Sequence, residues 1–333
     1  MTRRRVAPAL PLAALPALAL SGCRDVQSIL SPIGPAADRI HLLSWILFAG
    51  SGAIFLAVLV LAALALIGTP QSRRWLATER LVIGGGIVFP VVTLSILLIY
   101  GFGVMRAGGT VAADGEPLRV EVVGEQWWWR VVYGDAGGER VETANELRIP
   151  TGRAVELSLT TADVIHSFWV PNLAGKVDMI PGRTNRLTLL ADGPRVSRGQ
   201  CAEYCGGAHA LMSFFVIAMP PEEFARWYEA ARAPARDPQT EQERRGQALF
   251  LASGCGGCHT VRGTPAAGTI GPDLTHVGSR RSLAAATLPN DAAALARWIR
   301  DSQHIKPENR MPPYGIFSEG ELGALAAYLA SLR

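Results

Sequence analysis

Four of the five cysteines lie in two short clusters that each also contain a histidine, and the first cluster contains a methionine as well. The first cluster covers residues 201–212 and holds Cys201, Cys205, His209 and Met212. Thiolate, imidazole and thioether groups together are typical ligands of soft metal centres such as copper. Zinc sites usually close with cysteine and histidine alone, so the methionine favours copper.

His166 is a further candidate ligand, 35 residues upstream of Cys201. An alternative interpretation is a disulfide between Cys201 and Cys205, which is the ordinary use of paired cysteines in an exported protein. The disulfide would leave the neighbouring histidine and methionine unexplained, and we therefore favour the metal site.

The second cluster, Cys255-Gly256-Gly257-Cys258-His259, has the Cys-x-x-Cys-His pattern of covalent haem attachment. Both thiols add to haem vinyl groups and the histidine becomes an axial ligand of the iron. A zinc or redox role for Cys255 and Cys258 is disfavoured because His259 follows them directly.

The haem iron needs a second axial ligand further along the chain. Met311 lies in the proline-rich stretch Arg310-Met311-Pro312-Pro313-Tyr314 and is the favoured candidate. His276 and His304 are the rival ligands. Helices are expected over residues 242–252 and 319–332, on either side of these haem residues.

Short strands are expected ahead of the first cluster, because apolar and polar residues alternate there. The alternation is found in residues 118–122, 146–149, 154–159 and 186–190, with glycine and proline turns between them. This spacing favours a β-sandwich or barrel as the frame for the metal ligands.

Two apolar segments precede the strands. Residues 42–72 and 81–105 contain no charged side chain, and about 20 apolar residues are enough to cross a bilayer. We expect membrane-spanning helices near 42–67 and 81–103. The loop between them contains Arg73, Arg74 and Arg80 and is therefore expected to be cytoplasmic, which places everything after residue 106 outside.

The N-terminus has the pattern of a secretory signal, with Arg3 to Arg5 followed by an apolar run and small residues. Leu20-Ser21-Gly22-Cys23 resembles a bacterial lipobox, which implies a lipoprotein signal peptide over residues 1–22 and lipidation of Cys23. The alternative is an ordinary signal peptide with a spare thiol nearby.

Composition narrows the class of protein. The 333 residues are 49% hydrophobic and 18% charged, which excludes a disordered chain. The net charge of +4 gives no argument for nucleic acid as a partner. The length suggests more than one domain.

Residues 40–230 resemble subunit II of the haem–copper oxidases. The family pattern Cys-x-x-x-Cys-x-x-x-His-x-x-Met is complete, and Asp163-Val164-Ile165-His166-Ser167-Phe168 matches its other histidine ligand. The resemblance implies a cupredoxin fold that holds the binuclear copper centre CuA. It also implies that Glu203 offers its backbone carbonyl to copper and its side chain to a magnesium ion at the interface with the catalytic subunit. The alternative for Glu203 is a solvated loop carboxylate.

The run Gln126-Trp127-Trp128-Trp129 matches the aromatic motif of the same family. The resemblance implies that Trp127 is the surface aromatic through which electrons reach CuA, and the alternative is that the tryptophans only pack. Residues 178–183 match a family segment near the subunit interface.

One position departs from the family. A glutamate often lies at the mouth of a proton channel, seven residues before a helix proline, but the residue seven before Pro90 is Ile83. Glu79, about one helical turn away, could replace it or could be only a loop charge.

The C-terminal part is similar to class I cytochromes c. The resulting fold class is a multi-domain membrane protein with a two-helix transmembrane hairpin, an all-β cupredoxin domain and an all-α cytochrome c domain. We expect an anchor over residues 23–105, the copper domain over 106–229, a linker over 230–240 and the haem domain over 241–333.

These resemblances imply the electron-accepting subunit of a bacterial cytochrome c oxidase in the inner membrane, with both domains on the periplasmic face. A c-type cytochrome or other periplasmic donor would reduce haem c, and CuA would pass electrons to catalytic subunit I. That subunit, with subunit III as a further expected partner, would reduce oxygen to water and translocate protons. The alternatives are a CuA-type nitric-oxide reductase subunit and a membrane-anchored electron carrier without an attached enzyme.

Overall fold

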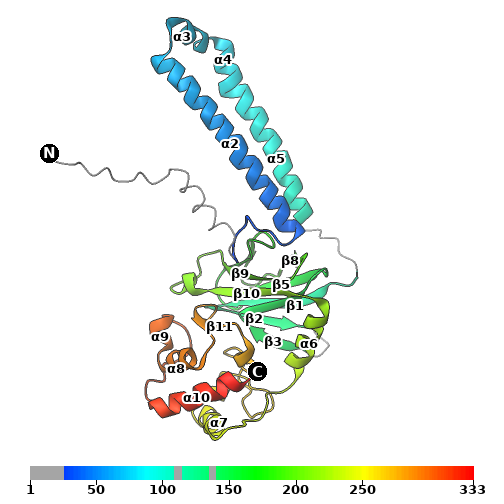
Figure 1. Ribbon diagram of the computed structural model, residues 1–333, viewed down its shortest axis with the longest axis vertical. Helices are drawn as coiled ribbons and strands as arrows, with labels where there is room; N and C mark the ends of the chain where they lie inside the picture. Colours follow the sequence, from blue (N-terminus) through cyan, green and yellow to red (C-terminus); the bar gives the residue numbers. More distant parts are fainter. Residues whose placement is uncertain (1–25, 109–114, 135–139) are drawn as a thin grey trace, which may run out of the picture.

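The computed structural model describes residues 26–108, 115–134 and 140–333, and it has three parts (Figure 1). A helical hairpin projects from a β-sandwich, and a small helical domain lies on the side of the sandwich away from the hairpin. The fold class predicted from the sequence is thereby confirmed. The predicted signal peptide over residues 1–22 and the predicted lipidation site Cys23 lie outside the described residues.

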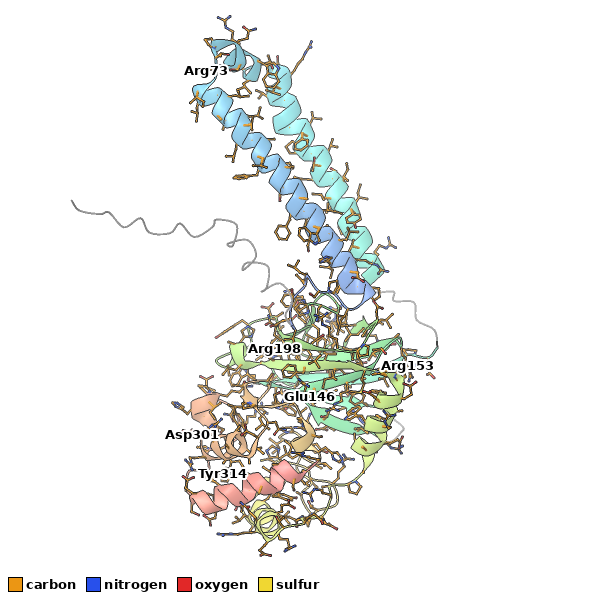
Figure 2. All side chains as sticks on the ribbon, in the orientation of Figure 1. Arg73, Glu146, Arg153, Arg198, Asp301 and Tyr314 are labelled. Atoms are coloured by element: carbon orange, nitrogen blue, oxygen red, sulfur yellow. The ribbon has the colours of Figure 1, made fainter. Side chains whose placement is uncertain are left out.

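The hairpin contains two helices that are long and apolar enough to cross a membrane, Pro35–Ile67 and Glu79–Arg106. The first begins ahead of the expected residue 42, with proline in the first turn, where its missing N–H costs nothing. Arg73 lies at the tip of the hairpin (Figure 2). The elements are α2 (Pro35–Ile67), α3 (Pro70–Leu76), α4 (Glu79–Ile83), the π-helical turn η3 (Gly84–Val88) and α5 (Phe89–Gly108).

The segment that precedes α2 is hydrogen-bonded to the sandwich. The N–H of Ile33 donates to the carbonyl of Asn172 (2.8 Å), and the carbonyl of Ile33 accepts from the N–H of Asp192 (2.9 Å). Gly34 fits so closely that a Cβ there would lie 2.1 Å from the carbonyl oxygen of Leu190. The start of the hairpin is therefore fixed to the β-domain.

The sandwich consists of two five-stranded sheets, in the orders β3-β2-β1-β5-β8 and β4-β10-β9-β6-β7. The pairs β1–β5 and β4–β10 are parallel, and the other pairs are antiparallel. The strands are β1 (Leu118–Glu125), β2 (Trp128–Tyr133), β3 (Val141–Ala144), β4 (Glu146–Pro150), β5 (Val155–Thr161), β6 (His166–Trp169), β7 (Val177–Met179), β8 (Asn185–Leu189), β9 (Arg195–Cys201) and β10 (Ser213–Met219).

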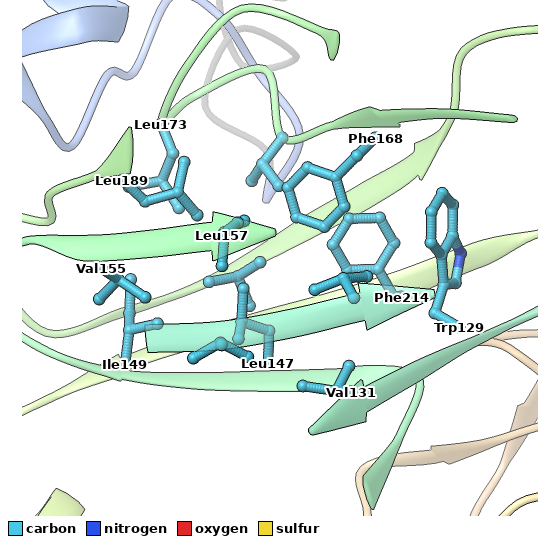
Figure 3. Close-up of a cluster of buried hydrophobic side chains, with 14 of the residues drawn as sticks. Trp129, Val131, Leu147, Ile149, Val155, Leu157, Phe168, Leu173, Leu189 and Phe214 are labelled. Atoms are coloured by element: carbon cyan, nitrogen blue, oxygen red, sulfur yellow. The ribbon is translucent and has the colours of Figure 1, made fainter. Parts of the chain in front are cut away.

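Side chains from both sheets fill the space between them (Figure 3). Alternation along the strands turns every second residue inward, as in Val155, Leu157 and Leu159, which are all fully buried. At one end of this core the rings of Phe168 and Phe214 lie 4.7 Å apart.

The C-terminal domain is helical, with one short hairpin that the sequence did not predict. Helices α7 and α10 cross closely because Gly246 has no side chain, and a Cβ there would lie 2.0 Å from the carbonyl oxygen of Ala324. The elements are α7 (Glu241–Ala252), η5 (Cys255–Gly257), η6 (Val277–Ser279), β11 (Ser282–Leu283), β12 (Leu288–Pro289), α8 (Ala292–Arg300), α9 (Ser302–Ile305) and α10 (Glu319–Ser331).

Helix α6 (Pro221–Arg232) connects the sandwich to the helical domain. It ends inside the expected linker 230–240, and α7 begins at Glu241, directly after that linker. The domain limits themselves stay a prediction.

The two domains meet through polar contacts. Arg130 donates to the carbonyl of Thr269 (2.8 Å), and Glu146, on the sandwich (Figure 2), accepts from the N–H of Arg281. Arg148 reaches the carbonyl of Ser279 (3.3 Å). Charged sandwich side chains thus satisfy backbone groups of the helical domain.

Replacing Tyr133 with phenylalanine is expected to destabilise the sandwich. Its buried hydroxyl accepts from the N–H of Arg148 (2.7 Å) and donates to the carbonyl of the same residue (3.0 Å) on edge strand β4. Tyr133→Phe leaves both groups without that partner, which should lower the free energy of unfolding by about 1–3 kcal/mol. Thermal or denaturant unfolding measures the loss.

Tyr228→Phe is the matched control, because Tyr228 belongs to the same aromatic cluster and, within the described residues, its hydroxyl makes no hydrogen bond. Equal stability of the native chain and Tyr133→Phe would contradict the prediction.

Candidate functional site

Strand pairing brings the predicted copper ligands together. Cys201 ends β9, and the loop after it runs to β10, the antiparallel neighbour of β9. His166 begins β6, whose Phe168 pairs with Cys201. The register of three strands thus places His166 beside a loop that comes 35 residues later. We call residues 201–212 the copper loop.

Five predicted side-chain ligands surround one point. The ligand atoms of His166, Cys201 and Cys205 all lie within 4.8 Å of one another. The Sγ atom of Cys205 lies 3.4 Å from Nδ1 of His209 and 3.8 Å from Sδ of Met212. The structure therefore brings all the predicted side-chain ligands to one place.

The two cysteines form no disulfide. Their sulfur atoms lie 3.8 Å apart, far beyond the roughly 2.05 Å of an S–S bond. The hydrogen bond between the two thiols lowers the pKa of Cys201 and raises the pKa of Cys205. Two adjacent thiols, two imidazoles and a thioether are a soft donor set that fits copper.

Asp163 contacts the candidate site, although its sequence pattern alone assigned it no role. Its carboxylate lies 2.8 Å from Nε2 of His166, which leaves Nδ1 facing the sulfur of Cys201 at 3.8 Å. Such a carboxylate commonly fixes the ring orientation of a metal-binding histidine. Its position three residues before the histidine was the available signal.

The charges of this pair support each other. Burial disfavours the charged forms of both Asp163 and His166. Several hydrogen bonds together outweigh burial. The pKa of Asp163 is lowered by its bonds with His166 and with the N–H groups of Gln126 and Val164, and the pKa of His166 is raised by its bonds with Asp163 and Cys201.

Glu203 presents its backbone and its side chain differently. Its carbonyl oxygen lies 3.1 Å from Sγ of Cys201, on the side of the candidate metal site, and its side chain is exposed. The carbonyl oxygen is thus placed to act as a ligand in the candidate metal site. The carboxylate is exposed to solvent.

The haem residues line one apolar cavity, whose wall comes mostly from the helical domain and partly from the sandwich. Cys255, Cys258, His259 and Met311 all contribute to its wall, together with buried side chains such as Leu325. His276 and His304 do not line it. His276 instead bonds to the carbonyl of Ala233 (3.0 Å). This placement favours Met311 as the second axial ligand.

The ring of His259 is oriented by the backbone. Its Nδ1 donates to the carbonyl of Pro272 (2.8 Å), so Nε2 is the nitrogen available to iron. Burial lowers the pKa of His259 and keeps the imidazole neutral, as a ligand must be. The attachment cysteines, the oriented histidine and the apolar walls therefore fit a covalent haem.

Trp127 is not the surface aromatic that was expected. Only 4% of it is exposed, because it lies in the wall of the haem cavity. Its Nε1 donates to the carbonyl of Cys205 (3.0 Å). The helical domain covers Trp127, which would be exposed if the two domains were separate. Trp127 thereby contacts both candidate sites.

The other tryptophans of the motif pack in two ways. Trp129 is buried against Phe214 in the sandwich, with ring centres 4.9 Å apart. Trp128 is half-buried beneath the guanidinium of Arg130, 4.7 Å from the ring centre.

At the hairpin tip, Glu79 is the first residue of α4 and Ile83 is the last. Both side chains are exposed. A part for Glu79 in a proton channel stays a prediction.

Comparisons with known proteins divide the chain at the same place as the structure. Residues 135–219 match the family described as cytochrome c oxidase subunit II, periplasmic domain, and residues 243–333 match the cytochrome c family. The chain is 36% identical to cytochrome c oxidase subunit 2 of Alkalihalophilus pseudofirmus, over 97% of this chain and 96% of that protein. It is 31% identical to the Bacillus subtilis subunit 2, with the same coverage.

Among solved structures, the chain is similar to the periplasmic domain of subunit II of cytochrome oxidase of Bradyrhizobium japonicum. The two are 32% identical, and the match covers 37% of this chain and 96% of that one, with a TM-score of 0.33.

A methyl group at Gly124 is expected to disturb the copper ligands. A Cβ there would lie 2.7 Å from Cδ2 of His166, whose ring is fully buried. Gly124→Ala should displace that ring and lower copper affinity by about 10- to 100-fold, as loss of a supporting group does. Copper retained by the full chain against a competing chelator measures the change.

Gly193→Ala is the control, because a Cβ at Gly193 meets nothing within 4 Å. If Gly124→Ala retains copper as well as the control does, the close packing of Gly124 against His166 does not position a copper ligand.

Proposed function

The chain belongs to the cytochrome c oxidase subunit II family and carries a C-terminal cytochrome c domain, and we propose that it is the electron-accepting subunit of a bacterial cytochrome c oxidase. It is membrane-anchored through its two apolar helices and has an exposed domain. In this proposal the helices lie in the inner membrane, and both domains face the periplasm.

The haem would be held by Cys255 and Cys258 through thioether bonds, with His259 and Met311 as axial ligands. The binuclear copper centre would be held by His166, Cys201, Cys205, His209 and Met212, together with the carbonyl of Glu203. When bound, these groups supply one-electron chemistry, from an external donor towards a catalytic subunit that reduces oxygen and translocates protons.

One observation carries the proposal. Trp127 lines the haem cavity and also donates a hydrogen bond to the carbonyl of the candidate copper ligand Cys205. A single buried side chain therefore joins the two sites. Burial excludes water from this contact, and the fixed partners lower the reorganisation that an electron transfer requires.

The residues around the two sites have supporting parts. Asp163 holds the orientation of His166, and the carbonyl of Pro272 holds that of His259. The loop with Met311 is fixed by Ser302 and Gln303, which both donate to the carbonyl of Met311.

The remaining parts of the proposal concern partners and processing. Catalytic subunit I, and subunit III with it, would contact the anchor and the copper domain, and a c-type cytochrome or similar periplasmic protein would be the donor. The exposed carboxylate of Glu203 would meet a magnesium ion at the subunit I interface, and Cys23 would be lipidated.

Loss of a copper ligand is expected to abolish oxygen consumption without emptying the haem site. In the purified membrane complex with a reduced c-type donor, Met212→Leu and Cys201→Ser should reduce oxygen uptake to near background. The haem should still be reduced, because its ligands lie in the other domain. Oxygen electrode traces and haem absorbance measure the two steps.

Met219→Leu is the matched control, since Met219 lies at the other end of β10 from Met212 and packs in the core. Absent oxygen uptake with intact nitric-oxide reduction would move the assignment to a reductase subunit. Activity towards neither, in a chain that purifies alone, would indicate a carrier.

Removal of the ring of Trp127 should slow electron transfer between the sites. Trp127→Leu loses both the aromatic ring and the hydrogen bond to the carbonyl of Cys205. Rapid mixing with a reduced donor should show normal haem reduction and delayed copper reduction. Trp227→Leu, on α6, is the control. Equal rates of copper reduction in the two variants would show that electrons do not pass from haem to copper through Trp127.

A further inference from the structure

Lys306 is a buried cation that the proposed function does not use. Only 2% of the residue is exposed, and its Nζ donates to three backbone carbonyls, of Trp127, Leu211 (2.9 Å) and Ala284 (3.3 Å). An ammonium group has three N–H donors and no acceptor, so these carbonyls satisfy it completely. Among the described residues, no carboxylate forms an ion pair with it.

The three carbonyls belong to three different parts of the molecule. Trp127 lies in the turn between β1 and β2, and its ring reaches the carbonyl of Cys205. Leu211 lies in the copper loop, directly before Met212. Ala284 lies in the β11–β12 hairpin of the haem domain. The side chain of Lys306 therefore joins the haem domain to the copper loop.

The β11–β12 hairpin has an unusual backbone where it meets the copper domain. Ala284, Ala285 and Ala286 all have positive φ angles, of 52°, 60° and 60°, which alanine adopts unfavourably. The carbonyl of Ala285 accepts from the N–H of Ser213 (3.3 Å), the residue after the copper loop. Contacts between the domains thus maintain a conformation that the sequence alone disfavours.

The chain after Lys306 also faces the copper ligands. The guanidinium of Arg310 lies 3.9 Å from the carboxylate of Asp163, which holds His166. The next residue is Met311, the candidate haem ligand. Lys306, Arg310 and Met311 all line the haem cavity as well, so residues 306–311 contact both candidate sites.

Packing alone does not account for a lysine here. An ammonium is costly to bury, and an apolar side chain of similar size would fill the space without that cost. Burial lowers the pKa of Lys306 to about 7, and attraction to Cys205 opposes this shift. A positive charge near the thiolates would favour the reduced form of a copper centre held there.

We propose that Lys306 is a positioning residue for electron transfer, whose side chain holds the haem domain on the copper loop and, when protonated, supplies a positive charge beside it. The inference rests on the proposed function, since it assumes that the two sites hold haem and copper. It assigns to one side chain both the docking of the domains and part of the driving force between them.

The test compares Lys306→Met, which removes charge and hydrogen bonds, with Lys306→Gln, which removes the charge but keeps N–H donors. Arg245→Met removes an exposed charge from the same domain and is the control. Haem and copper contents of each purified complex are measured first. The readouts are the equilibrium sharing of electrons between haem and copper, and hydrogen exchange of residues 282–289.

Both Lys306 variants should shift electron sharing towards the haem, by about tenfold for the loss of one nearby charge. Hydrogen exchange in the hairpin should rise in Lys306→Met and rise less in Lys306→Gln. Unchanged electron sharing in both variants, or an equal shift in Arg245→Met, would overturn the proposal. The Met212→Leu result is independent of these outcomes, so a failure of the proposed function can be recognised separately.

Discussion

The pairing of β9 with β6 and β10 is the constraint on which the rest of the structure depends. A soft metal centre needs several sulfur and nitrogen atoms at fixed positions, and a loop of twelve residues is too short to hold them alone. The register that pairs Phe168 with Cys201 supplies the missing histidine. Beneath the loop, the packed rings of Trp129, Phe168 and Phe214 keep the strand ends rigid. The sandwich core is thus the support that preorganises the ligands before any metal arrives.

Fusion of the haem domain changes what the copper domain presents to its surroundings. Trp127, which would be open to a docking partner in a separate copper domain, is enclosed by a domain of the same chain. A covalent connection replaces a collision between two proteins with a high effective concentration of one domain at the other. The charged contacts of Arg130, Arg148 and Glu146 then select one orientation. In the proposed function, the surface offered to an external donor would accordingly belong to the haem domain.

Local patterns made much of this architecture predictable. The copper loop and the Cys-x-x-Cys-His motif carry their ligands within a few residues, and the apolar helices and alternating strands have periods that a sequence displays directly. The burial of Trp127 and the contacts of Lys306 were not predictable in this way. The carbonyls that Lys306 reaches on the copper domain are 179 and 95 residues away in sequence, and backbone acceptors leave no signal in residue type. Similarly, the early start of α2 depends on Gly34 fitting against Leu190.

The attachment of residues 26–34 to the sandwich has a consequence for how the protein is assembled. In the proposed topology the chain leaves the β-domain, crosses the bilayer twice and returns to the same β-domain, which would fix the hairpin at both ends. The carbonyl of Val26 accepts from Arg198, and Ile33 bonds to Asn172 and Asp192, all of which are synthesised much later. In that topology the leading segment would stay unpaired on the outer face until the later strands had been exported. Once the bonds close, the domain loses the freedom to swivel about a single tether, and the membrane itself becomes a reference plane for the orientation of the copper loop.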